Sequence, residues 1–223
     1  MMIGMTPRKS PVVISAVMKK GGAGKTSTIV PLASFAAQTG ARVALIDMDS
    51  TPSAHQWFTA AELGSETFAC DRVTADELDP LLRDIRESNA FDFVFIDTPP
   101  GDKHGIVQAM SESDLVLMPL HIGSGDVPQL VETYHLMRLP LRANPDLQHL
   151  VVVNHAGTMP AVTRDTITAI QGELPDARIA ATTIPYSKQY ALAKGTRPDR
   201  VKWWHYDKLW KEIQILLPRE VPA

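Results

Sequence analysis

The sequence predicts an α/β fold in which a mostly parallel β-sheet is flanked by helices on both faces. Short apolar runs alternate with segments of helix length along the chain, which is the order of strands joined by helical crossovers. Most of these runs are too apolar to alternate with polar residues, which is typical of strands buried on both faces. The expected strands cover residues 12–18, 42–47, 92–97, 114–119, 148–154 and 178–184.

Length and composition favour a single domain. The 223 residues are 44% hydrophobic and 21% charged, which suits one sizeable core over residues 11–217, with a flexible tail over 1–10 and a frayed end over 218–223. We expect a cytoplasmic protein, because no apolar run reaches the ~18 residues that span a membrane and no signal-peptide pattern is visible. Cys70, the one cysteine, is expected to be buried and apolar, and the seven histidines lack zinc-ligand spacing.

A glycine-rich loop from Lys20 to Thr26 follows the first expected strand and precedes a helix. Its glycines let backbone N–H groups converge on phosphate oxygens, and the helix N-terminus adds its dipole. Lys25 and Thr26 supply an ammonium and a hydroxyl that can bind magnesium. The pattern indicates a nucleoside triphosphate site, contacted by Gly21, Gly22, Ala23, Gly24, Lys25, Thr26 and Ser27.

The loop and its helix contain two irregularities. Lys19 stands where the strict phosphate-loop pattern has glycine, and the additional lysine Lys20 follows it. We expect the Lys19 side chain to point to solvent. Pro31 falls inside the expected first helix, where it should cost about 3 kcal/mol unless the helix kinks or tightens.

Three acidic residues end the next two apolar strands. Asp47 and Asp49 close one strand and Asp97 closes another, and ligands gather at the carboxyl ends of parallel strands. Thr26 and Asp97 are therefore candidate magnesium ligands, with Asp97 acting through a water molecule. The alternative for Asp47 and Asp49 is an acidic turn that caps the next helix.

A dinucleotide site is the competing interpretation, because Gly22-Ala23-Gly24 followed by Asp47 imitates that fingerprint. The dinucleotide fingerprint requires a third glycine, however, and this chain has Ser27 at that position. Lys25-Thr26 and Asp97 have no role in a dinucleotide site. A triphosphate is therefore favoured.

Together these motifs resemble the deviant Walker A ATPases of the ParA/MinD family, and most closely the small ParA-type plasmid partition ATPases. The resemblance rests on Lys20-Gly21-Gly22-Ala23-Gly24-Lys25-Thr26, on Asp47-Met48-Asp49 and on Asp97-Thr98-Pro99-Pro100-Gly101, with weaker matches at residues 151–154 and 184–185. It implies a P-loop fold, ATP and Mg²⁺ as cofactors, and a homodimer that forms with ATP.

The resemblance also implies roles for individual residues. Lys20 would reach the partner protomer's phosphates in the manner of an arginine finger, Asp49 would orient the attacking water, and Lys25 completes the catalytic set. Asp47 would join Thr26 and Asp97 at the metal, near its hydration shell, and Asn154 and Pro185 would lie beside the adenine. The chain departs from the family where Ser50-Thr51 replaces Pro-Gln and where His155 replaces an arginine.

A basic stretch near the C-terminus is the candidate DNA-binding surface. Six basic residues against two acidic ones give it a net charge of +4, while the rest of the chain is −7. Nonspecific duplex binding needs mainly phosphate-neutralising side chains. The alternative is an ordinary solvated surface whose interleaved aromatic residues pack into the core. The basic residues are Lys194, Arg197, Arg200, Lys202, Lys208 and Lys211.

We therefore expect an ATPase that dimerises on ATP, binds double-stranded DNA nonspecifically and positions or segregates plasmid or other cargo, with hydrolysis stimulated by a ParB-like partner. Such a protein would be associated with the nucleoid when ATP is bound. One alternative is a VirC1-like DNA-transfer factor or protein-cluster positioning ATPase. Another is a MinD-like membrane-cycling ATPase, for which residues 206–217 form an apolar helical stripe; core packing is the favoured interpretation of that stripe, so no membrane partner is expected.

Overall fold

A computed structural model describes residues 10–122, 125–156 and 159–217, so most of the expected tail and all of the expected frayed end lie outside the described residues. The described chain forms a seven-stranded sheet, parallel throughout, in the order β3-β2-β4-β1-β5-β6-β7. The α/β prediction is therefore confirmed. The strands are β1 Val12–Ala16, β2 Val43–Asp47, β3 Phe68–Arg72, β4 Phe93–Asp97, β5 Leu115–His121, β6 Gln148–Ala156 and β7 Ile184–Pro185.

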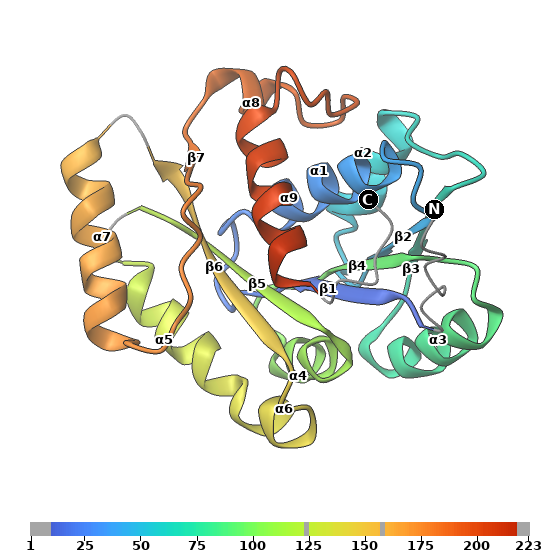
Figure 1. The fold of residues 1–223 in the computed structure, drawn as a ribbon, viewed down its shortest axis with the longest axis horizontal. Coiled ribbons are helices and arrows are strands. Elements are labelled where there is room, and N and C mark those ends of the chain that lie inside the picture. Colours follow the sequence, from blue (N-terminus) through green and yellow to red (C-terminus); the bar gives the residue numbers. More distant parts are fainter. Residues whose placement is uncertain (1–9, 123–124, 157–158, 218–223) are drawn as a thin grey trace, which may run out of the picture.

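Helices cover both faces of this sheet (Figure 1). One face carries α1 Lys25–Ala37, α2 Ser53–Ala60, α8 Lys188–Leu192 and α9 Trp204–Leu216, and α9 packs on α1. The other face carries α3 Ala75–Ser88, α4 Lys103–Glu112, α5 Val127–Leu136, α6 Arg138–Ala143 and α7 Pro160–Glu173.

The central strand β1 is buried on both sides because successive side chains point to opposite faces. Val12, Ile14 and Ala16 belong to the core beneath α1 and α9, whereas Val13 joins the core with α3 and α4. Every β1 residue is at most 1% exposed, which explains why the run lacks polar alternation.

The apolar stripe of the C-terminal helix packs into the core. Tyr206, Leu209, Trp210 and Ile213 are buried, and the Trp210 ring meets Phe93 edge-on with centroids 5.4 Å apart. The favoured interpretation of this stripe is confirmed. A membrane surface could contact these side chains only if α9 left the sheet.

The expectation of one strand over 178–184 is wrong. Ile179 forms an isolated bridge with Val151, and a separate two-residue strand begins at Ile184. Strand β3 was missed because it lies at the sheet edge and its residues, except Phe68, are exposed or half-buried. Cys70 lies on it and is half-buried rather than fully buried.

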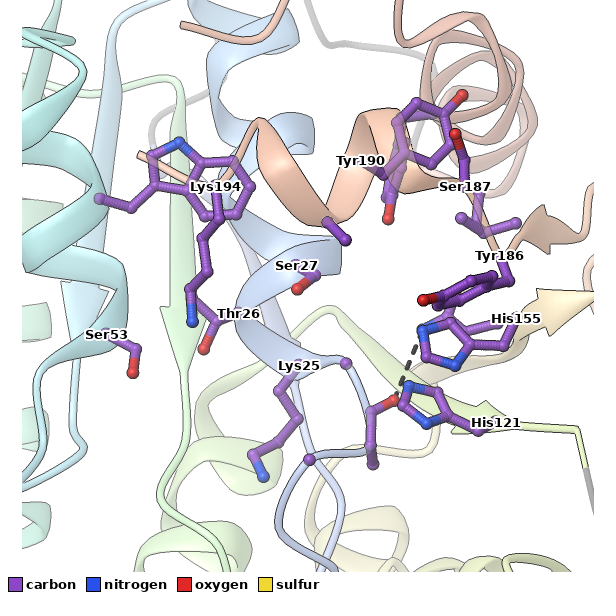
Figure 2. A pocket seen from close by; sticks show the side chains of 18 of the residues that line it. Lys25, Thr26, Ser27, Ser53, His121, His155, Tyr186, Ser187, Tyr190 and Lys194 are labelled. Carbon is purple, nitrogen blue, oxygen red and sulfur yellow. Dashed lines mark hydrogen bonds between the residues drawn. The ribbon is translucent and has the colours of Figure 1, made fainter. Parts of the chain in front are cut away.

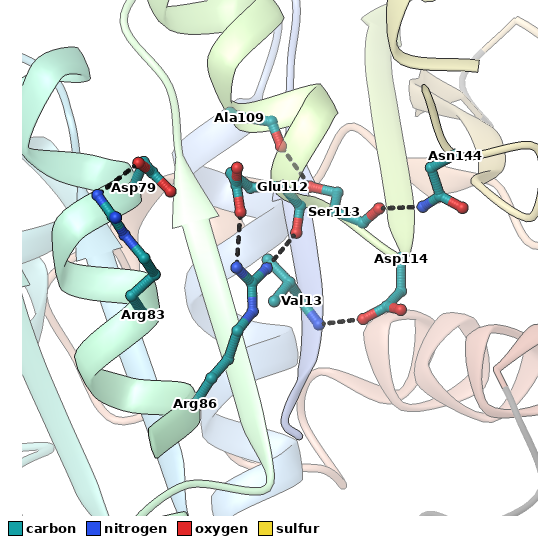
Figure 3. Close-up of polar contacts among 9 residues, drawn as sticks. All are labelled: Val13, Asp79, Arg83, Arg86, Ala109, Glu112, Ser113, Asp114 and Asn144. Carbon is teal, nitrogen blue, oxygen red and sulfur yellow. Dashed lines mark hydrogen bonds and ion pairs between the residues drawn. The ribbon is translucent and has the colours of Figure 1, made fainter. Parts of the chain in front are cut away.

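Polar contacts fasten the end of the sheet opposite the glycine-rich loop (Figure 3). Asp114 accepts the backbone N–H of Val13 at 2.8 Å, which ties β5 to β1. Arg86 on α3 donates to the Glu112 carboxylate of α4 at 2.8 Å. The first contact joins two neighbouring strands and the second joins two helices on one face of the sheet.

Candidate nucleotide site

The sheet order brings the acidic strand ends to the glycine-rich loop. Strand β4 lies between β1 and β2, and its last residue, Asp97, is in register with Ala16 on one side and Asp47 on the other. The Thr98 hydroxyl donates to the Ala16 carbonyl at 2.8 Å and fixes the end of β4 to the start of the loop. Asp47 and Asp97 are each 1% exposed, so both carboxyls are held inside the protein.

The loop adopts the backbone that a phosphate cradle needs. Gly22 and Gly24 have φ values of 74° and 96°, a region that side chains rarely adopt, and Gly24 directly precedes α1. The Lys25 ammonium is 3.2 Å from the Met18 carbonyl and 3.5 Å from that of Lys20. Burial lowers the pKa of Lys25, and the charges of Asp97 and Asp49 oppose that shift. The loop therefore encloses a buried cation beside two carboxylates.

Thr26 and Asp97 form the pair expected of a magnesium site. The Thr26 hydroxyl donates to Asp97 Oδ2 at 2.5 Å. Burial raises the pKa of Asp97 to about 7, against the smaller opposing effect of this hydrogen bond. Asp97 Oδ1 is also buried and has no hydrogen-bond partner among the described residues. A hard cation with its water shell fits this donor set, because it would use the unpartnered oxygen and offset the cost of burying the charge.

Asp47 is directed away from that pair. Its Oδ2 accepts the backbone N–H groups of Ala54 and His55, both at 2.9 Å, and its Oδ1 accepts that of Asp49 at 3.0 Å. These contacts fasten the first turn of α2 and use both carboxylate oxygens. For Asp47 the geometry favours the helix-capping alternative over metal ligation.

Asp49 is the acidic residue that borders the cavity. It lines the same pocket as Lys25 and Thr26, and its Oδ1 accepts only the Thr51 backbone N–H at 2.9 Å among the hydrogen bonds of the described chain. Its carboxylate thus retains free acceptor positions for a water molecule.

Lys20, the first residue of the glycine-rich loop, and Lys19 just before it are held by acidic residues on or beside α5. The Lys20 ammonium donates to Asp126, the residue that precedes the helix. Lys19 forms an ion pair with Glu132, one turn and a half further along, and its side chain is only 18% exposed. The expectation that Lys19 points to solvent is wrong, because α5 lies within reach of its ammonium.

The other end of the cavity is built from the ends of β5, β6 and β7. His121 pairs with Asn154 between β5 and β6, and its ring stacks on that of His155 with centroids 3.7 Å apart. Tyr186 meets the His155 ring edge-on at 5.1 Å (Figure 2). Burial lowers the pKa of both histidines, so both are neutral at neutral pH.

Asn154 and Pro185 both line this part of the cavity. Asn154 is 3% exposed, and its Oδ1 has no partner among the described residues. A buried, unpartnered amide oxygen suits an exocyclic amino group such as that of adenine. The geometry therefore supports the expected base-side placement of both residues.

One cavity of about 290 Å³ joins these parts. The loop occupies its floor, with Ser53 on one side and the His121–His155–Tyr186 group on the other (Figure 2). Sequence reasoning missed several of its lining residues. His121 lies two residues after the expected strand 114–119 and is the last residue of β5, so the rule of carboxyl-terminal strand ends could have found it. Other lining residues lie on segments without a nucleotide-binding motif: Ser53, Trp57, Tyr186, Ser187, Tyr190, Ala191, Trp203 and Tyr206.

The six basic residues of the C-terminal stretch do not form one uninterrupted face. Arg200 and Lys211 both pair with Asp207, at 3.2 and 2.6 Å. Lys208 lies 4.4 Å above the Trp204 ring. Lys194 lines the nucleotide cavity and extends toward Thr26 in Figure 2, and the other two, Arg197 and Lys202, are exposed.

Comparison with known proteins places this site in a family. The family described as VirC1 protein matches residues 12–194, which include the loop, the acidic strand ends and the base-side residues. A curated relative from Gloeobacter kilaueensis, maintenance of carboxysome distribution protein A, is 36% identical over 139 residues. That match covers 61% of this chain and 62% of the relative.

A second relative, the virC1 protein of Rhizobium radiobacter, is 34% identical over 131 residues, or 56% of each chain. This chain thus matches less than two thirds of the length of either relative. Among solved structures, a Cyanothece McdA variant in complex with ATP superposes with a TM-score of 0.73 at 17% identity, over 92% of this chain and 96% of that one. This likeness confirms the fold.

Proposed function

Because the chain belongs to the VirC1 protein family, within the ParA/MinD class of P-loop ATPases, we propose that it is a magnesium-dependent ATPase that dimerises when it binds ATP. The observation that supports this best is the Thr26–Asp97 pair beside the buried Lys25, with one Asp97 oxygen left without a partner. The pair has the oxygen ligands that Mg²⁺ prefers and lies at the start of a helix that follows a phosphate loop.

The positions of the loop, the acidic residues and Lys20 support distinct roles in ATP hydrolysis. The loop amides and Lys25 bind the β- and γ-phosphates, and Thr26 with Asp97 would hold Mg²⁺, which supplies neutralising charge when bound. Asp49 orients the water that attacks the γ-phosphate. Lys20 stabilises the developing charge on the nucleotide of a second protomer, which couples hydrolysis to dimerisation.

Substitutions separate these roles. Lys25→Ala should abolish ATP turnover, whereas Lys20→Ala and Asp49→Ala should lower turnover and leave ATP binding within a few fold of the wild-type affinity. Turnover is measured by phosphate release and binding by fluorescence of a labelled ATP. If Lys20→Ala or Asp49→Ala turned over ATP at the wild-type rate, the trans-lysine and water-orienting roles would be wrong.

We further propose that the ATP-bound dimer binds double-stranded DNA nonspecifically and positions cargo, with a ParB-like partner that stimulates hydrolysis. Exposed Arg197, Lys202 and Lys208 support a phosphate-binding surface, and a dimer would present it twice. One matched relative is named for carboxysome distribution, which makes a protein cluster an alternative cargo. Another is named virC1, which makes transferred DNA a second alternative.

Filter retention of random-sequence duplex tests the DNA proposal. Retention should require ATP rather than ADP and should fall steeply with salt. Lys202→Ala should reduce it, whereas Lys211→Ala, which removes a charge already paired with Asp207, should reduce it less. Retention that is absent, or equal with ATP and ADP, would refute the proposal.

Membrane cycling in the manner of MinD has less support. No helix among the described residues is long and apolar enough to cross a bilayer. Four apolar residues of α9 that could bind a membrane surface are buried in the core: Tyr206, Leu209, Trp210 and Ile213.

A further inference from the structure

Lys20 is not free in this protomer. Its ammonium donates to Asp126 Oδ1, and Asp126 Oδ2 accepts the backbone N–H of His121 at 3.2 Å. Asp126 immediately precedes α5, yet its side chain does not cap that helix. Both oxygens of the carboxylate are therefore used to join the phosphate loop and the end of β5.

The two members of this ion pair differ in burial. The Lys20 side chain is 47% exposed, whereas that of Asp126 is 8% exposed. A half-exposed ammonium can move into solvent or toward another anion with little loss. A buried carboxylate that loses its cation is destabilised, because the remaining charge is unpaired and poorly hydrated, and the half-exposed position of the ammonium keeps this cost modest. The pair therefore favours the arrangement in which Lys20 stays on its own protomer.

In the proposed dimer Lys20 would exchange Asp126 for the phosphates of a second protomer. The two contacts are alternatives, and the equilibrium between them depends on the difference in interaction free energy. A triphosphate with its γ-phosphate offers more negative charge than a diphosphate, so it competes better with Asp126 for the ammonium.

We propose that Asp126 is a latch that holds Lys20 in the free protomer and makes dimerisation depend on a triphosphate in a second copy of this chain. This inference rests on the proposed ATP-dependent dimer and assigns a regulatory role to a residue outside the phosphate loop. Asp126 acts through Lys20, so it is a positioning residue. Without the latch, Lys20 is available for the second copy at all times.

Asp126→Asn tests the latch, because an asparagine oxygen still accepts the His121 N–H while the charge is lost. The matched control is Glu132→Gln. It removes the same charge at a nearby position, within α5 rather than just before it, and breaks the ion pair of Lys19 instead. Sedimentation velocity with Mg²⁺ and the nonhydrolysable analogue AMPPNP, or with ADP, measures dimerisation without requiring turnover.

We expect Asp126→Asn to dimerise about fivefold more tightly than the wild type with AMPPNP and to form more dimer with ADP, in line with the modest value of a partly exposed ion pair. Glu132→Gln should match the wild type. In a Lys20→Ala background, Asp126→Asn should have no effect on dimerisation. If the asparagine variant fails to fold, as judged by circular dichroism, Asp126→Ser should change dimerisation in the same direction.

Three results separate the failure modes. A wild-type protein that stays monomeric with AMPPNP refutes the proposed dimer and the latch with it. A wild-type dimer that Asp126→Asn leaves unchanged or weakens refutes the latch alone. An equal gain from Glu132→Gln, or a gain that persists without Lys20, shows that general charge rather than the latch controls dimerisation, and also overturns the inference.

Discussion

Removing the charge of Asp97 should stabilise the nucleotide-free protein and abolish binding of Mg²⁺ at the proposed site. Asp97 is 1% exposed, and Oδ1 lacks a partner among the described residues. Asp97→Asn keeps the shape and an oxygen that accepts the Thr26 hydroxyl, but it carries no charge to bury. The substitution therefore separates the cost of this carboxylate from its function.

The magnitude follows from the pKa. Burial raises the pKa of Asp97 from 3.8 to about 7 in the folded protein. A folded-state pKa above the unfolded value means that ionisation opposes folding, so stability is lost as pH rises from the unfolded pKa through the folded one. At 1.36 kcal/mol per pKa unit, the penalty approaches about 4 kcal/mol above about pH 7. The part of it that develops between about pH 5.5 and about pH 8 is about 2 kcal/mol.

Urea unfolding of the wild type and Asp97→Asn in EDTA, at about pH 5.5 and about pH 8, measures this difference. The free energy of unfolding of the variant, relative to that of the wild type, should be about 2 kcal/mol higher at about pH 8 than at about pH 5.5. For a typical urea dependence this changes the difference between the two unfolding midpoints by ~1 M. Adding Mg²⁺ and ATP should raise the midpoint of the wild type and raise that of the variant much less. An advantage that stays constant with pH would refute the assignment of the buried charge to Asp97.

Three further predictions test other parts of the site. Asp47→Ala should destabilise the protein by about 3 kcal/mol in urea unfolding, because it leaves the amides of Asp49, Ala54 and His55 without their acceptor. Gly24→Ala should abolish binding of labelled ATP, since the added Cβ would lie 2.5 Å from the Asn154 amide nitrogen at a φ of 96°, and circular dichroism checks that the fold survives. Cys70 should react slowly with iodoacetamide at about pH 8 in the native protein and rapidly in urea, because burial raises the pKa of its thiol to about 12; equal rates would contradict that shift.

The parts of the fold that sequence reasoning predicted well are those where local pattern and tertiary role agree. The runs at 12–18 and 92–97 are apolar because their strands lie in the middle of the sheet, so composition alone marks them. The glycine-rich loop can likewise be predicted from a short stretch of sequence. Its conformation depends on glycines at positions 22 and 24, which have φ values that other residues avoid.

The features that were missed depend on partners distant in the chain. Strand β3 pairs with only one neighbour and needs no apolar pattern, so its sequence gives little signal. Lys19 looked solvent-exposed until α5 brought Glu132 to it, and Lys20 meets Asp126 across 106 positions. The two hydrogen bonds from α2 to Asp47 depend on the path of the chain after β2. The Asp47-Met48-Asp49 pattern does not predict that path.

The position of α9 has a consequence for biosynthesis. Trp210 lies against Phe93 and Phe95, and α9 covers α1, whose first residues are the nucleotide site. A ribosome adds about 5–20 residues per second, so roughly 6 to 23 s separate the synthesis of Phe93 from that of Trp210. During that interval the part of the sheet face on which α9 packs, around Phe93 and Phe95, lacks its cover and is exposed to chaperones and proteases. A message truncated before α9 would yield a chain that contains every nucleotide-binding motif yet cannot bury the core that supports them.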